Sequence, residues 1–299
     1  MELKEWNLKV PWGNIALLSR GNTSGEPVLL VHGRLDSAAT FLPLLKLIPA
    51  KYYCVLVDLP GNGKSDPFPK GMVLSRFVGV PIIDLVVQHL GWEKFTYIGH
   101  SLGSEQGMFY ASIYPKRVKK AVYLDPGPSL EYCNAVNYKR FFKSYQNFYD
   151  NYHKYDSERE YTKEQAMRSV LNARAINEEE AEIVLSRCLV ETGPNLYRLS
   201  WDRRYKITPG FNSLPQQFYI DLFSQHRTPS LFICASVMTD LYYQQSNLSV
   251  KLMSHMSEEN KNVNVIWVEG GHDVHLTNPE RFINELLMFL DNDFVISKL

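Results

Sequence analysis

The sequence lacks the features that mark membrane, secreted and nucleic-acid-binding proteins. Its 299 residues contain no apolar run approaching the roughly 18 residues of a membrane-spanning helix. The opening residues MELKEWNLKV carry too many charges for a secretory signal peptide. Lysine and arginine together number 32, as do aspartate and glutamate, so the net charge is zero. We therefore expect no membrane span, and there is no basic excess that would indicate nucleic acid as a partner.

Cysteine is scarce and scattered. The four cysteines, Cys54, Cys133, Cys188 and Cys234, form no C-x-x-C pair and no Cys/His cluster. The spacing typical of zinc sites and redox pairs is therefore absent. We therefore expect neither a metal nor an organic cofactor. Cysteines that remain free thiols are typical of a protein in a reducing compartment.

Repeats and low-complexity stretches are also absent, and the composition is ordinary. Apolar residues make up 45% of the chain and charged residues 21%, values typical of a soluble globular protein. A chain of this length folds as one large domain or as a core with an insertion. It is long enough to bury a sizeable core.

Short apolar runs alternate with helical stretches at both ends of the chain. The expected strands are 3–10, 14–20, 28–32, 52–58, 95–98, 118–124, 231–235 and 263–268, and the first two form a hairpin. The expected helices are 37–48, 72–90, 102–114, 246–256 and 279–290. We expect Gly79 and Pro81 to interrupt or kink the second helix. Near-continuous apolar strands that alternate with helices indicate an α/β protein with a mostly parallel sheet covered on both faces.

This alternation stops near Pro126 and resumes near Pro229. We predict an α/β core formed by 1–127 and 228–299, with a helical cap inserted at 128–227. Two of its helices are expected at 162–175 and 177–191. Aromatic residues recur every three or four positions from Tyr138 to Tyr155 and so define one helix face. This face either packs against the core or forms an apolar roof over a pocket.

The pentapeptide Gly99-His100-Ser101-Leu102-Gly103 fits the pattern G-x-S-x-G. An expected strand precedes it and an expected helix follows it. This context is typical of a nucleophile elbow, a strained turn that exposes a serine hydroxyl. The elbow also puts Ser101 at a helix N-terminus, whose dipole favours negative charge. Ser101 is therefore the candidate nucleophile.

A second loop, Val31-His32-Gly33-Arg34, follows an earlier strand. Glycine there lets the backbone approach a ligand, and the N–H groups of Leu102 and Arg34 are candidates for an oxyanion hole. We place Arg34 and His100 at the substrate. The Arg34 cation would attract an anionic substrate or pair with Asp36.

A serine nucleophile needs a base, and the segment 270–275 offers two histidines. His272 directly follows a Gly-Gly turn at a strand end, and we favour it over His275. Other polar residues have structural explanations. We expect His32 to be structural and Asp36 to cap the helix that begins at Ser37.

The base in turn needs a carboxylate that orients its imidazole. Asp125 ends the strand 118–124, and Asp240 follows the strand 231–235. Both lie where the carboxyl ends of parallel strands form sites. The residues alone leave these two candidates open.

These motifs together resemble the α/β-hydrolase fold. The resemblance rests on His32-Gly33, on the loop 58–66 with its glycines, on the Ser101 elbow and on Gly271-His272. It covers nearly the whole chain and implies a mostly parallel central sheet with helices on both faces and a triad of serine, acid and histidine. Most relatives place the acid where Asp240 lies, and a minority place it at Asp125.

More narrowly, the chain resembles the serine hydrolase-like proteins, a peroxisome-associated subgroup. The features are His32-Gly33-x-Leu35-Asp36-x-Ala38, Leu124-Asp125 and the segment 198–204. Within this subgroup the Leu-Asp pair recurs, so we favour Asp125 as the acid. An aromatic residue is more usual at the position of Arg34.

The sequence ends in Ser297, Lys298 and Leu299. A terminal S-K-L is the peroxisomal import address, so we expect a peroxisomal location and the import receptor as a partner.

The predicted function is a serine hydrolase, of the carboxylesterase or thioesterase type, that cleaves an ester or thioester with an apolar acyl group. The alternative is a protein that keeps the fold and binds an apolar small molecule with little or no turnover, because fold alone does not fix function.

Overall fold

The structure is a computed structural model that describes residues 2–126, 138–153, 159–206, 215–225, 227–238 and 249–291. The alternative acid Asp240 and the terminal residues Ser297, Lys298 and Leu299 lie outside the described residues. Among the helices of the described part, none is long and apolar enough to cross a membrane.

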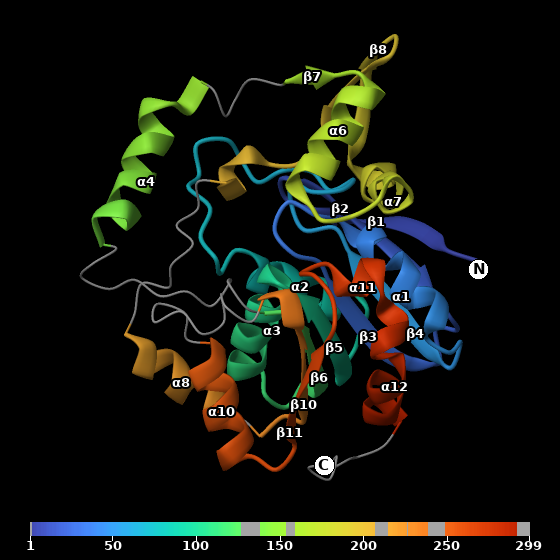
Figure 1. Cartoon of the computed structure of the whole chain (residues 1–299), viewed down its shortest axis with the longest axis vertical. Helices are drawn as coiled ribbons and strands as arrows, with labels where there is room; N and C mark the ends of the chain where they lie inside the picture. Colours follow the sequence, from blue (N-terminus) through green and yellow to red (C-terminus); the bar gives the residue numbers. More distant parts are fainter. Residues whose placement is uncertain are drawn as a thin grey trace.

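An eight-stranded sheet forms the centre of the molecule (Figure 1). Its strands are β1 (Lys4–Val10), β2 (Gly13–Arg20), β3 (Glu26–Val31), β4 (Tyr52–Val57), β5 (Phe95–His100), β6 (Val118–Leu124), β10 (Ser230–Ala235) and β11 (Val263–Val268). Their order is β1-β2-β4-β3-β5-β6-β10-β11. The first two form the expected antiparallel hairpin, β2 pairs antiparallel with β4, and the strands from β4 to β11 run parallel. The predicted mostly parallel sheet is confirmed.

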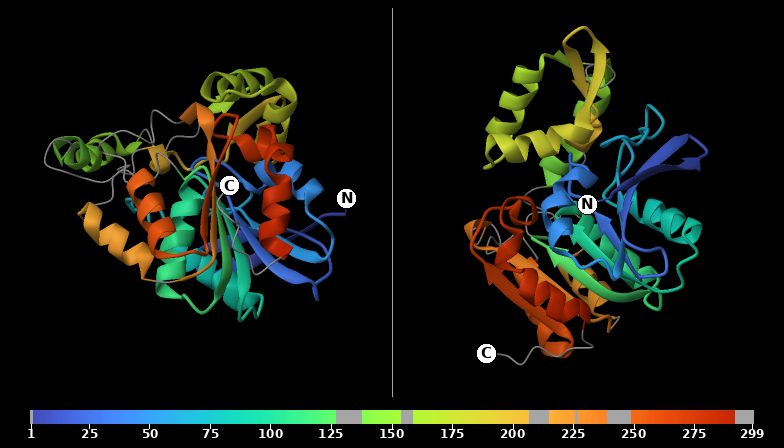
Figure 2. Two further views of the ribbon diagram at one scale, coloured as in Figure 1. Left: turned by 60° about the horizontal axis from the view of Figure 1, so that its bottom comes forward. Right: turned by 90° about the vertical axis from the view of Figure 1, so that its right-hand side faces the viewer.

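Helices cover both faces of this sheet, as Figure 2 shows. One face carries α2 (Gly79–His89), α3 (Leu102–Ile113), α8 (Gln216–Ser224) and α10 (Ser249–Glu259); the other carries α1 (Leu42–Leu47) and α12 (Ile283–Asp291). Strand side chains alternate between the two faces. In β3, Leu29 and Val31 join the first cluster, whereas Val28 and Leu30 join the second. Both faces are apolar because both are buried.

The helix expected at 72–90 is shorter than predicted. It begins only at Gly79, and Pro81 lies in its first turn. The N–H groups of a first helical turn have no intrahelical acceptor, so a proline there loses no hydrogen bond. Pro81 therefore marks the start of α2 and does not interrupt it.

The segment between β6 and β10 adds no described strand to the central sheet. We call its described residues, 138–153, 159–206 and 215–225, the insertion. Its elements are α4 (Tyr138–Asp150), β7 (Glu160–Tyr161), α6 (Lys163–Ala173), α7 (Glu178–Cys188), β8 (Leu189–Gly193), β9 (Leu196–Leu199), η3 (Arg203–Lys206) and α8. Three of them form a small antiparallel sheet of order β7-β9-β8. The predicted helix 177–191 therefore ends early, at Cys188, where the chain enters β8.

The insertion packs on the core through apolar and ionic contacts. Residues of α6 and α7 share a buried cluster with Leu276, which lies in the short helix α11 (Val274–Thr277). Arg187 of α7 donates to the buried carboxylate of Asp58 in the core, with 2.6 Å between Nη2 and Oδ2. These contacts hold α6 and α7 against the loops that follow β4 and β11, at the upper end of the molecule in Figure 1.

Candidate functional site

Ser101 lies at a strained turn between β5 and α3. Its φ is 51° and its ψ is −116°, a conformation that residues other than glycine avoid. Its amide donates to the carbonyl of Leu124 over 3.0 Å, and Ser104 Oγ donates to the carbonyl of Gly99 over 2.7 Å. Such outliers cluster at functional sites, because only the surrounding structure holds them in place. The turn has the form expected of a nucleophile elbow.

Two glycines allow neighbouring segments to approach this turn. A Cβ at Gly103 would lie 2.2 Å from the carbonyl oxygen of Val31. A Cβ at Gly33 would lie 3.1 Å from the Cβ of Ser101. The first glycine lets α3 pack directly on β3, and the second brings the loop after β3 against Ser101.

His272 and Asp125 form a hydrogen-bonded pair beside the elbow. Nδ1 of His272 bonds Oδ2 of Asp125, whose carboxylate is fully buried. The other oxygen, Oδ1, accepts from the amide of Ala235 over 2.8 Å. Asp125 has a φ of 41°, so its backbone is also held in an unusual conformation. The structure thus brings one of the two candidate acids to His272.

The surroundings of His272 raise its pKa. Burial disfavours the imidazolium form, but the hydrogen bond and the charge of Asp125 favour it, with a further contribution from Asp273. The net effect is a pKa above the ordinary value of 6.5. The imidazole is about one-third exposed, with 32% of the side chain accessible. The candidate base His272 is therefore accessible from solvent.

His100 connects the elbow to the loop that carries His272. Its Nε2 lies 3.0 Å from the carbonyl oxygen of His272, to which it donates, and the two rings lie 4.7 Å apart between centroids. Because His100 immediately precedes Ser101, this bond holds Ser101 and His272 as neighbours. His100 itself is buried, with 2% of its surface exposed.

The candidate oxyanion donors lie on either side of Ser101. The amide of Leu102 opens α3, where N–H groups lack intrahelical acceptors. Arg34 follows Gly33, the residue that approaches the Ser101 side chain, and its own side chain is exposed. Among the described residues, no carboxylate lies within ion-pair distance of Arg34. The alternative in which it pairs with Asp36 is wrong, because Asp36 pairs with Arg174 at 3.2 Å.

Asp36 also does not have the predicted capping role. The helical turn η1 (Ala38–Phe41) is capped by Ser37, whose Oγ accepts from the amide of Ala39. The Asp36 carboxylate instead accepts from Thr40 Oγ1 over 3.2 Å. Serine and aspartate are both good caps, so sequence could not tell which of two adjacent residues takes this position.

His32 is a structural residue, as predicted. It is fully buried, and its Nε2 accepts from the amide of Leu59 over 2.9 Å. Its Nδ1 donates to the carbonyl of Gly33 over 2.7 Å, which fixes a neutral ring with one proton. Burial lowers its pKa accordingly. This histidine joins the loop after β3 to the loop after β4.

Sequence reasoning missed Arg174 and Asp273. Arg174 lies at the end of α6, and its guanidinium is close to Asp36 and Asp273 in two loops of the core. No motif or spacing signals this contact, because it depends on how the insertion packs. Sequence reasoning also missed a group of side chains that could hold a metal ion, namely Asp36, His100 and His275.

A cavity of about 330 Å³ lies between the insertion and the loop after β4. None of the predicted site residues in the described part of the chain lines it. Its basic lining residues are Lys64, Lys70, Arg159, Arg198, Arg203, Arg204 and Lys206, and its acidic ones are Asp66 and Asp202. Asp202 pairs with Arg204 at 2.6 Å, and Asp66 accepts from Asn14. Among the described residues, the cavity is therefore predominantly basic.

The aromatic face predicted for the start of the insertion is only partly buried. Phe148 of α4 is 1% exposed and lines this cavity. Tyr138, Phe142 and Tyr149 each have more than half of their surface exposed. Phe148 thus contributes an apolar wall to the cavity, whereas these three side chains do not pack in the core.

Residues 26–279 match the sequence model of the alpha/beta hydrolase fold. This match covers most of the chain and agrees with the sheet order and the elbow. The chain belongs to the α/β-hydrolase fold family. The predicted resemblance is confirmed at this level.

Known proteins similar to this α/β hydrolase include hydrolases of several kinds. A serine hydrolase-like protein of Danio rerio is 28% identical over 96% of this chain and 88% of its own length. A thioesterase domain from the curacin biosynthetic pathway has a TM-score of 0.79 at 18% identity, over 96% of this chain and all of that one. Carboxylesterase CesB of Bacillus subtilis has a TM-score of 0.63 at 18% identity, over 97% of this chain and 92% of that one. The two solved structures establish likeness of fold.

Proposed function

We propose that this α/β hydrolase is a serine hydrolase that cleaves an ester or thioester bond. The observation that carries the proposal is the His272–Asp125 pair, which lies beside the strained Ser101. A buried carboxylate on Nδ1 of an accessible imidazole leaves Nε2 as the base, which is the arrangement that activates a serine hydroxyl.

The proposed reaction proceeds through an acyl-enzyme. Ser101 Oγ attacks the carbonyl carbon while His272 Nε2 takes its proton, and Asp125 stabilises the imidazolium that forms. The oxyanion accepts from the amides of Leu102 and Arg34, and each such donor contributes about 2.7–4 kcal/mol to the transition state. His272 then protonates the leaving alcohol or thiol. In the second half, His272 takes a proton from water while the water oxygen attacks the acyl carbon. His272 then returns this proton to Ser101 Oγ as the acyl bond breaks, which releases the acid and restores the serine.

Two further features support the choice of substrate class. The similar structures include a thioesterase domain and a carboxylesterase. We propose that the insertion serves as a cap, and that the basic cavity beneath it favours substrates that carry an anionic group in addition to an apolar acyl chain. No step of this reaction needs a metal ion or an organic cofactor.

The alternative is a binding protein in which these residues turn over little or no substrate. A fluorophosphonate, which phosphonylates activated serines, separates the two. We expect the wild-type chain to be labelled, and Ser101→Ala and His272→Ala to remain unlabelled although folded. A series of p-nitrophenyl esters should then give one preferred acyl length. A folded wild type that neither labels nor hydrolyses any ester would favour the binding protein.

A further inference from the structure

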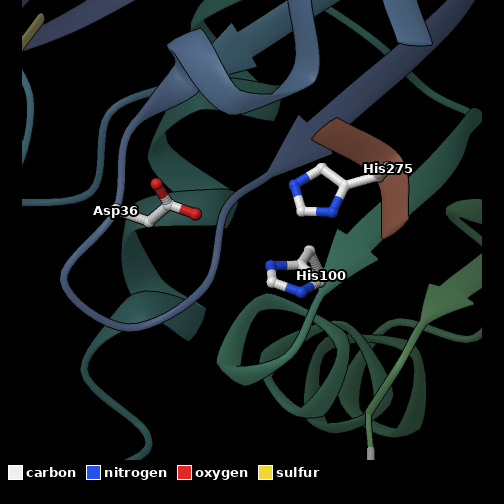
Figure 3. A group of neighbouring side chains, drawn as sticks. All are labelled: Asp36, His100 and His275. Carbon is white, nitrogen blue, oxygen red and sulfur yellow. The ribbon is translucent and has the colours of Figure 1, made fainter. Parts of the chain in front are cut away.

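Three buried side chains from separate parts of the sequence converge behind the elbow (Figure 3). Asp36 follows β3, His100 ends β5 and His275 lies in α11. Their exposed fractions are 1%, 2% and 0%. One ligand atom from each side chain lies within 4.8 Å of the other two.

Polar atoms of this group lack hydrogen-bond partners among the described residues. They are Nδ1 of His100, Oδ1 of Asp36 and both ring nitrogens of His275. Oδ1 of Asp36 lies 3.2 Å from Arg174 Nη2, an ion pair without hydrogen-bond geometry. A buried polar atom without a partner costs about 1–3 kcal/mol. Several such atoms around one point indicate that the site has an occupant.

The atoms that Asp36, His100 and His275 direct at one another are mainly hydrogen-bond acceptors. His100 donates from Nε2 to a carbonyl oxygen, so its Nδ1 carries no proton when the ring is neutral. His275 is fully buried and presents two ring nitrogens without partners, of which a neutral ring protonates only one. Asp36 offers only acceptor oxygens. A cation fits this set better than a further hydrogen-bond acceptor would.

The charges around the group favour a cation as well. Asp36 and Asp273 contribute two negative charges, and Arg174 contributes one positive charge between them. In this set, two carboxylates therefore face one guanidinium. Water would satisfy hydrogen bonds but would not offset the second carboxylate.

We propose that Asp36, His100 and His275 bind a divalent late transition metal ion of the zinc type. Two imidazole nitrogens and one carboxylate oxygen form a donor set that zinc accepts, with water as a fourth ligand. Imidazole-rich sites favour zinc, nickel or copper over magnesium, which prefers oxygen ligands. Ligands at about 2.0–2.2 Å from a tetrahedral ion lie roughly 3.3–3.6 Å apart. The three ligand atoms, which lie within 4.8 Å of one another, would therefore draw together when the ion binds.

This site is distinct from the proposed hydrolytic reaction, which needs no metal. Its binding can therefore be tested on inactive protein. Ser101→Ala, freed of metal by a chelator, is titrated calorimetrically with zinc chloride and separately with magnesium chloride. We expect one zinc ion per chain, a raised unfolding temperature and no binding of magnesium. Absence of stoichiometric zinc binding would show that water alone occupies the group and would overturn the proposal.

A matched pair of variants assigns the ion to this site. His275→Gln removes one ligand, and we expect zinc affinity to fall by at least tenfold. His153→Gln changes an exposed histidine elsewhere and should leave the affinity unchanged. Equal binding by both variants would overturn the assignment.

If His275→Gln does not fold, the ¹⁵N chemical shifts of the histidine rings in the parent chain take the place of this comparison. Zinc must then shift Nδ1 of His100, and an unshifted Nδ1 overturns the proposal.

Discussion

Arg174 and Asp36 form an ion pair that joins the insertion to the loop after β3, with 3.2 Å between Nη2 and Oδ1. The same guanidinium donates to the carbonyl of Leu35 over 3.3 Å and lies 3.5 Å from Oδ1 of Asp273. Asp273 follows His272 directly. One side chain of the insertion therefore contacts both the loop that carries Arg34 and the loop that carries the candidate base.

We predict that Arg174→Ala strongly destabilises the protein. Asp36 is 1% exposed, and removal of its cation leaves a buried carboxylate without a counter-charge. Breaking a buried pair in this way costs about 3–5 kcal/mol. Urea unfolding followed by circular dichroism measures the change. Arg168→Ala, an exposed arginine on the same helix, is the control and should change stability by less than about 0.5 kcal/mol. Similar values for the two variants would contradict the structural role of Arg174.

The raised pKa of His272 predicts the pH dependence of hydrolysis. The base must be neutral to accept the Ser101 proton, so kcat/KM should fall as pH drops through that pKa. Because the hydrogen bond and charge of Asp125 outweigh burial, we expect the inflection above 6.5. An inflection below 6.5 would show that Asp125 does not act on His272 in solution.

Asp125→Asn tests the same pair directly. The neutral amide no longer stabilises the imidazolium, so the pKa of His272 should fall, as measured by NMR titration of the histidine ring. We expect kcat to drop by about 10⁴-fold, because an amide also favours the wrong tautomer. Asp240→Asn is the comparison, and it should retain activity if Asp125 is the acid. The opposite ranking of the two variants would move the acid to Asp240.

Sequence could identify the parts of this site that are local in the chain. Ser101 and His272 stand in short motifs whose glycines and flanking strands define their geometry. The residues alone left the acid open because Asp125 and Asp240 each follow an expected strand, and only the resemblance to the serine hydrolase-like proteins, through Leu124-Asp125, favoured Asp125. The sheet itself was predictable from alternating apolar runs.

Contacts between distant segments were not predictable. Arg174 belongs to the insertion, and its partners depend on how α6 packs over the core. Asp36, His100 and His275 have no metal-ligand spacing in the sequence, and only the parallel sheet brings them together. Pro81 was misjudged for a related reason, since a proline in a first helical turn and one within a helix look alike in sequence.

The strained backbone of Ser101 predicts a gain in stability when strain is removed. A non-glycine residue in such a conformation costs about 1–3 kcal/mol. Glycine adopts it freely but loses about 0.5–1 kcal/mol more in chain entropy on folding. We therefore expect Ser101→Gly to be more stable than Ser101→Ala by roughly 1 kcal/mol in urea unfolding. Both variants lack the hydroxyl, so the comparison is independent of activity. A less stable Ser101→Gly would show that the turn is unstrained.

The basic cavity predicts a preference for substrates with an anionic end. The mono-p-nitrophenyl ester of dodecanedioic acid and p-nitrophenyl dodecanoate have the same chain length and differ in one terminal carboxylate. We expect the charged ester to have the lower KM. Arg198 lines the cavity from β9. Arg198→Ala should reduce the ratio of the two KM values by roughly tenfold, which corresponds to the loss of one charge-assisted hydrogen bond.

The matched control for this prediction is again Arg168→Ala, which removes the same charge from the insertion but does not line the cavity. It should leave the ratio of the two KM values unchanged, whereas added salt should reduce that ratio in every variant that retains Arg198. Hydrolysis of the uncharged ester should be the same in both variants, since neither substitution touches Ser101 or His272. If both variants reduce the ratio equally, the preference comes from the overall field of the insertion and the substrate's anionic end does not enter this cavity.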